Sequence, residues 1–181
     1  MVGTPEEPVD LDVEGDYRHE HTHITFPVSL GGIPRTRVTK YDEAALDVAG
    51  GYDEPANVQS FPPSAPIVLT VLVYPAGERL ESHMEGVNAE IPLAFAGAKL
   101  ATSRPYEFTA GERSLKGLYS RHTIPSLAPV GDYAVVLDTY LFRVRREGAR
   151  WFLKVRATLQ KSAAGQVDEA IAAWLCPILT P

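Results

Sequence analysis

The stretch from Ile67 to Tyr74 is the feature that most constrains how this chain can fold. It is an almost unbroken run of apolar and β-branched residues, and Pro75 and Gly77 end it. Side chains of a β-strand point alternately to the two faces of a sheet, so a strand of this composition needs both faces covered. We therefore expect a central strand with a packing layer on each side.

Two segments show the period of amphipathic helices, which would supply those layers. In each segment, apolar side chains recur at intervals of three and four residues with polar residues between them. The first set is Leu80, Met84, Val87 and Ile91, and the second is Val167, Ala170, Ile171, Trp174, Leu175 and Ile178. The pattern predicts one helix in each segment.

The clearest hairpin pattern lies between these two helices. Residues 132–145 and 151–158 read as two long strands joined by a short loop, as in hairpins. Alternating patterns at 35–41 and 48–52 predict a shorter peripheral pair. We expect one α+β domain, mostly an antiparallel sheet sandwiched between helices. With 181 residues, 45% of them hydrophobic, it can bury a core without disulfides.

The first 18 residues differ in composition from the rest of the chain. They hold little apolar content, two prolines and six acidic side chains, which are Glu6, Glu7, Asp10, Asp12, Glu14 and Asp16. Such a segment buries too little apolar surface to order itself. We expect residues 1–18 to form a disordered acidic arm and residues 19–181 to form the domain.

Charge and hydropathy limit the partners and the location of the protein. A net charge of −6 disfavours nucleic acid and anionic membrane surfaces, because both attract clustered lysine and arginine. No stretch approaches the ~20 apolar residues that span a bilayer, and the start lacks the pattern of a signal peptide. We expect no nucleic-acid partner and no membrane insertion. A cytoplasmic location is the default expectation, and export is the alternative if a signal segment precedes the chain.

His19, His21 and His23 form the first candidate site. If they lie in a strand, alternation projects their imidazoles from one face. Same-face neighbours are about 6.5–7 Å apart, so two of them can reach one divalent transition metal. An outside ligand such as His83, His122 or a carboxylate would complete the site. The alternative is a solvated face beside the acidic arm.

The second candidate is a group of basic residues on the long hairpin, Arg143, Arg145, Lys154 and Arg156. Alternation places Arg143 and Arg145 on one face of their strand, and Lys154 and Arg156 on one face of theirs. Arginine forks match carboxylates and phosphates, so this group predicts a site for an anionic ligand or an acidic partner protein. The alternative is a solvated hairpin end whose cations form weak surface ion pairs.

Sequence motifs of catalysis are missing from the chain. It contains no G-x-S-x-G, no P-loop, no G-x-G-x-x-G after a strand, no H-E-x-x-H and no C-x-x-C. Glu78, Glu81 and Glu85 have the spacing of a solvated helix side, and Cys176 lacks a basic neighbour that would activate its thiol. These observations favour a protein without catalytic activity and without a cofactor.

Several segments, taken in order, resemble bacterial proteins of unknown function with the PsbP/Mog1-like fold. The segments are 24–27, Gly31-Gly32, Tyr41, Tyr52, 70–75 and 153–158. The resemblance implies an antiparallel sheet between helices, an α/β/α sandwich. It also implies a non-catalytic binding or assembly role, because better-known members of that fold act in this way.

These observations lead to two functional hypotheses. The first is a non-enzymatic binding or assembly factor whose partner is another protein, and the basic hairpin is its candidate surface. The second is a metal-binding protein or metal-dependent enzyme that uses the face formed by His19, His21 and His23. The two hypotheses differ in whether further ligands meet that face.

Overall fold

The computed structural model describes residues 7–54, 66–125, 135–160 and 163–179. Its main sheet contains, in spatial order, β1 (Val9–Asp10), β5 (Ile33–Lys40), β6 (Val48–Glu54), β7 (Ile67–Pro75), β11 (Ala149–Leu159), β10 (Val135–Arg146), β9 (Arg113–Ile124) and β8 (Lys99–Ala110). Each neighbouring pair is antiparallel. The short β4 (Ser29–Leu30) pairs with β5, and β2 (Tyr17–Arg18) pairs with β3 (Thr25–Phe26) in a separate hairpin.

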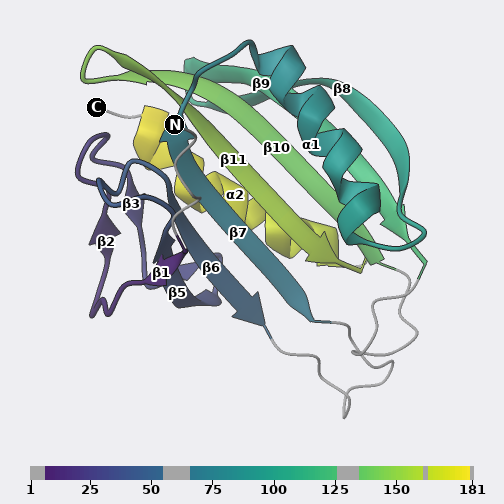
Figure 1. The fold of residues 1–181 in the computed structure, drawn as a ribbon, viewed down its shortest axis with the longest axis horizontal. Coiled ribbons are helices and arrows are strands. Elements are labelled where there is room, and N and C mark those ends of the chain that lie inside the picture. The colour runs from purple at the N-terminus through teal and green to yellow at the C-terminus, as the bar shows by residue number, and fades with distance from the viewer. Residues whose placement is uncertain (1–6, 55–65, 126–134, 161–162, 180–181) are drawn as a thin grey trace.

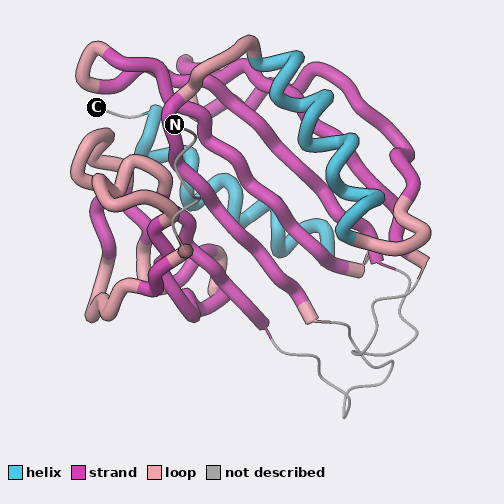
Figure 2. Tube along the Cα trace, viewed as in Figure 1, coloured by secondary structure: helices cyan, strands magenta, loops and turns pink. Residues whose placement is uncertain are grey.

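Two helices cover the sheet, α1 (Leu80–Ala94) and α2 (Ala164–Leu179). Figures 1 and 2 show α1 in front of the sheet near β8, β9 and β10, and α2 behind it. Alternation along β11 agrees with this view, because Phe152 packs with Met84 of α1 whereas Leu153 joins the cluster that contains Trp174 of α2. The protein is an α+β fold built on an antiparallel sheet, as the sequence predicts.

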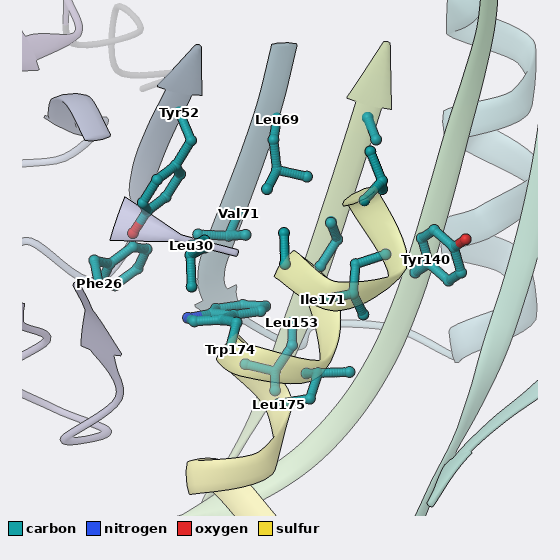
Figure 3. Packing of buried hydrophobic residues seen from close by; sticks show 14 of the residues in the cluster. Phe26, Leu30, Tyr52, Leu69, Val71, Tyr140, Leu153, Ile171, Trp174 and Leu175 are labelled. Carbon is teal, nitrogen blue, oxygen red and sulfur yellow. The ribbon is translucent and has the colours of Figure 1, made fainter. Parts of the chain in front are cut away.

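The larger part of the core lies between the sheet and α2. Val71 of the central run packs there with Leu153 and with Trp174 of the helix, and all three side chains are buried (Figure 3). Phe26 and Tyr52 extend the cluster toward the N-terminal strands. The run at 67–74 therefore lies in the interior of the sheet, between β6 and β11, with side chains on both faces.

The segment expected to be a disordered arm is ordered where the structure describes it. Val9 and Asp10 pair with β5, and Tyr17 and Arg18 pair with β3. The Asp10 carboxylate accepts a hydrogen bond from the Thr39 hydroxyl at 2.5 Å. Composition missed these pairings because the strands they extend lie later in the sequence. Residues 1–6 are outside the described residues.

The turn between β4 and β5 approaches the backbone of α2 at Gly31. Gly31 has a φ of +55°, and a Cβ atom built there would lie 2.8 Å from the backbone nitrogen of Ala170. Glycine is favoured for both reasons, because it accepts a positive φ and has no side chain to clash. This contact holds the N-terminal strands against the helix.

Among the described residues, neither helix combines the length and the apolar character needed to cross a lipid bilayer.

Candidate functional site

The three N-terminal histidines lie at the turn between β2 and β3, not in a strand. Residues 20–22 form the turn itself, and His23 has a φ of 59°. The prediction that one strand face presents all three imidazoles is therefore wrong. Alternation suggests a strand here, but the β2–β3 hairpin reverses direction within these residues.

The His19 ring is used in structural contacts. It is fully buried, its Nδ1 accepts a hydrogen bond from the Thr22 backbone N–H at 3.2 Å, and its Nε2 lies 3.3 Å from the Leu46 carbonyl oxygen. The His19 and His21 rings both pack against Trp151, with centroids 5.3 and 6.2 Å away. Within the described part of the chain, no group of three histidine, cysteine or acidic side chains is placed to hold a metal ion. The prediction of a bound metal gains no support from this arrangement.

The basic residues of the long hairpin share one face of the sheet. Arg143 lies opposite Phe152 in the register of β10 and β11, and Phe152 faces α1. Directly opposite residues project to the same face, so Arg143, Arg145, Lys154 and Arg156 all lie on the α1 face. Arg143 and Arg145 are exposed at the hairpin end, whereas Lys154 and Arg156 are half-buried.

Lys154 and Arg156 are the unusual pair in this group. Neither forms an ion pair or a hydrogen bond with another described residue. The Nε atom of Arg156 is buried and has no hydrogen-bond partner within the described part of the chain. Burying a charge without a partner is costly, so this pair of cations is suited to receive an anion. We call this place, with Lys154 and Arg156 at its centre, the α1-face site.

The pKa of the Lys154 amine is lower than that of an exposed lysine, although the amine stays mostly protonated at neutral pH. Its Nζ atom lies 5.1 Å from the centroid of the Tyr74 ring, a contact that favours the charged form. Burial, and then the nearby charge of Arg156, lower the pKa of Lys154 to about 8, although Asp47 and Glu90 act in the opposite direction. Lys154 therefore loses its proton closer to neutral pH than an exposed lysine does.

Gly51 and Thr70 form the far side of the site. Gly51 of β6 lies opposite Thr70 of β7, which lies opposite Arg156 in the register. The side chain of Arg37 crosses over Gly51, since a Cβ atom there would lie 3.0 Å from the Arg37 Cγ. Arg37 and Arg156 therefore lie on the same face of the sheet, with Gly51 and Thr70 between them.

A hydrogen-bonded chain borders the site on the helix side. The Tyr74 hydroxyl lies 2.6 Å from His83 Nε2, and His83 Nδ1 lies 2.7 Å from a Glu78 carboxylate oxygen. The His83 ring stacks on Phe152 with centroids 4.5 Å apart. The spacing of Glu78 predicts only a solvated helix side, so this chain could not be predicted from it. The proximity of Glu78 and His83 at the start of the helix could have suggested the contact between these two residues. The contact of His83 with Tyr74 depends on how the helix packs on the sheet, which the sequence does not show.

Polar atoms without partners also lie beneath α1. Neither ring nitrogen of the fully buried His122 has a hydrogen-bond partner within the described residues, and the same holds for Asn88 Oδ1 and Thr139 Oγ1. Thr139 lies directly opposite Arg156 in the register. Unsatisfied polar groups therefore continue from the α1-face site toward the interior.

The burial of His122 predicts a stability that depends on pH. Desolvation, aided by the Arg156 charge, lowers the pKa of His122. The unfolded chain therefore binds a proton at His122 more readily, and stability falls as the pH falls below the unfolded pKa of about 6.5. As the pH falls from 7 to 5, the parent protein should lose stability through His122, whereas His122→Leu should not. The free energy of unfolding of His122→Leu minus that of the parent protein should therefore increase. Urea titrations of both proteins at pH 7 and pH 5 would measure this difference. Burial also lowers the pKa of His19, but His19 is present in both proteins, so its contribution cancels. A difference independent of pH would contradict the prediction.

A separate groove of about 1190 Å³ lies at the C-terminal end of α2 and includes Trp174, Arg113 and Arg146 in its lining. Arg146 Nη2 donates to the Ile178 carbonyl at 2.5 Å, and Arg113 Nη1 donates to the Leu179 carbonyl at 2.6 Å. The last carbonyls of a helix lack intrahelical partners, so both arginines stabilise the helix end. These cations are already engaged, unlike those of the α1-face site.

Comparison with solved structures finds a similarity to LpqN of Mycobacterium tuberculosis, which is described as involved in cell envelope biogenesis. The alignment covers 69% of this chain and 67% of LpqN, with 13% sequence identity and a TM-score of 0.43. No protein-family model matches the chain, and no curated protein sequence matches it. The likeness to LpqN is too distant to assign a role.

Proposed function

We propose that this protein is a non-enzymatic binding domain that holds a small anionic group at the α1-face site. The observation that carries the proposal is the pair Lys154 and Arg156, two half-buried cations without an ionic partner among the described residues. A carboxylate or phosphate would supply a counter-charge beyond that of the nearby Asp47 and Glu90, and would accept hydrogen bonds from the guanidinium of Arg156.

The position of the site favours a small ligand group over an extended acidic surface. Arg143 and Arg145 are exposed at the hairpin end, where ion pairs are weak. Arg156 lies deeper along the same face, opposite Thr139 in the register. An anion that reaches Arg156 loses bound water and gains hydrogen-bond donors that the protein holds in place. Because this place is partly shielded from water, each charge-assisted hydrogen bond is stronger there than on the exposed surface.

The PsbP/Mog1-like resemblance agrees with this proposal, because it also implies a binding role without catalysis. We propose that the sheet and its two helices belong to that α/β/α sandwich. In this view, the hairpin of β10 and β11 presents the ligand-binding cations, and any protein partner delivers its acidic group to the same face.

Calorimetric titration with phosphate, acetate and lactate at low ionic strength tests the proposed function. We expect at least one of these anions to bind, and Arg156→Gln to weaken its binding by roughly tenfold or more, since a hydrogen bond to a charged group contributes about 1.5–3 kcal/mol. Arg143→Gln is the matched control, because it removes an exposed cation from the same face. We expect this control to bind as the parent protein does.

Equal weakening by both substitutions would contradict the proposal, because it would indicate a general effect of net charge. Absence of binding for all three anions would also contradict it. Circular dichroism spectra of the variants would establish that each is folded before its affinity is compared.

A further inference from the structure

Lys154 has an amine beside the anion site that could do more than attract a negative charge. Its Nζ atom lies over the Tyr74 ring, two residues along β11 from Arg156, and makes no ion pair with a described residue. We propose that Lys154 captures the carbonyl carbon of a small 2-oxo acid as an imine, while Arg156 holds the carboxylate of the same molecule. This inference rests on the proposed function and names its ligand class.

The spacing of the two cations suits a ligand with adjacent carbonyl and carboxylate groups. Lys154 and Arg156 are alternate residues on one strand, so their backbones lie about 6.5–7 Å apart on the same face. Both side chains are long and flexible, and they can converge on a short molecule. A 2-oxo acid joins its carboxylate carbon directly to its carbonyl carbon, so one end can lie on the guanidinium and the other at the amine.

The electrostatic surroundings make the amine available as a nucleophile. The groups that act on Lys154 are Arg156, Asp47 and Glu90, together with the Tyr74 ring. With a pKa of about 8, roughly half of the amine is neutral at pH 8, whereas an ordinary lysine is less than about 1% neutral there. Only the neutral amine has the lone pair that attacks a carbonyl carbon.

The chain of Tyr74, His83 and Glu78 borders the place where a proton is needed. The nitrogen lone pair of Lys154 forms the bond to carbon while the carbonyl electron pair moves to oxygen, and a proton passes from nitrogen to oxygen to give a carbinolamine. The hydroxyl group then leaves as water after accepting one proton, and the product is a protonated imine. Burial raises the pKa of Tyr74, so its hydroxyl keeps its own proton and passes one on only as it receives another from His83, which Glu78 holds by its other ring nitrogen.

Reductive trapping on the full chain tests this inference. The protein is incubated with pyruvate and cyanoborohydride, and the mass and position of the adduct are determined by mass spectrometry. We expect one reduced pyruvate per chain, mapped to Lys154, and at least a tenfold slower reaction in Lys154→Arg, which keeps the charge but removes the amine. Arg156→Gln should slow trapping of pyruvate by roughly tenfold. Trapping of acetone, which has no carboxylate, should not change.

Lactate separates failure of this inference from failure of the proposed function, because it carries the carboxylate but no carbonyl group. Binding of lactate together with adducts spread evenly over the lysines would overturn imine formation and leave the anion site standing. Absence of binding for phosphate, acetate and lactate alike would overturn the proposed function and the 2-oxo acid assignment with it. If phosphate binds and lactate does not, the 2-oxo acid assignment alone is overturned. Trapping that proceeds equally well in Lys154→Arg would overturn the choice of nucleophile.

Discussion

Replacing Trp174 by alanine lowers the free energy of unfolding by about 3–5 kcal/mol, the range for removing a large aromatic side chain from a core. Trp174 is 2% exposed and lies in the cluster between α2 and the sheet (Figure 3). Its Nε1 donates to the Thr25 carbonyl at 3.0 Å, and its ring lies 6.2 Å from that of Phe26. One residue therefore joins α2 to the N-terminal strands. Chemical denaturation followed by circular dichroism measures the loss.

Trp174→Phe is the matched control for this prediction. It keeps most of the ring packing and removes the indole N–H, so it should cost less than the alanine variant and leave mainly the Thr25 carbonyl unsatisfied. If alanine and phenylalanine destabilise the protein equally, packing of the Trp174 ring contributes little to the stability of the core, which would contradict the prediction.

Asp138→Ala should destabilise the fold by roughly 3 kcal/mol, because it leaves a partly buried guanidinium without its partner. The Asp138 side chain is 3% exposed and accepts hydrogen bonds from Arg121 Nε at 2.7 Å and Arg121 Nη2 at 2.6 Å. The Tyr119 hydroxyl donates to the same carboxylate at 3.0 Å. Since the Arg121 side chain is 28% exposed, water reduces the loss below that of a fully buried pair. Thermal and urea unfolding would measure it.

The double variant Arg121→Leu with Asp138→Leu tests the cause of that loss. Removing both charges leaves no unpaired ion, so this variant should recover much of the stability lost in the single variant. If the double variant is as unstable as the sum of two single variants, the two side chains act independently, and the destabilisation has another origin.

The main elements of the fold could be predicted from the sequence because their signals are local. The apolar run from Ile67 to Tyr74 is a central strand, and the two amphipathic segments are α1 and α2. The hairpin at 132–158 is β10 and β11, although residues 132–134 lie outside the described part of the chain. The N-terminal pairings were missed, because β1 and β2 are two residues long and are defined by their partners.

The candidate site could be predicted only in part. Alternation placed Lys154 and Arg156 on one face, and the structure agrees. Their lack of ionic partners depends on the register with β7 and on the position of α1, which no local pattern reveals. The contact of Tyr74 with His83 likewise joins a strand end to a helix. The predicted arrangement of His19, His21 and His23 on one strand face was wrong, because residues that alternate in sequence can also form a turn, as they do here.

The anion site is tested most directly at the Arg156 guanidinium, with its Nε–H group as the reporter. Protein labelled with nitrogen-15 at arginine would be titrated with the anion found by calorimetry, and the side-chain Nε–H signals would be followed by NMR, with Arg156→Gln identifying the Arg156 signal. We expect a saturable shift of the Arg156 signal at the affinity measured by calorimetry, while the signal of the exposed Arg143 moves little. An Arg156 signal that does not respond while the anion binds would place the anion elsewhere and contradict the α1-face site.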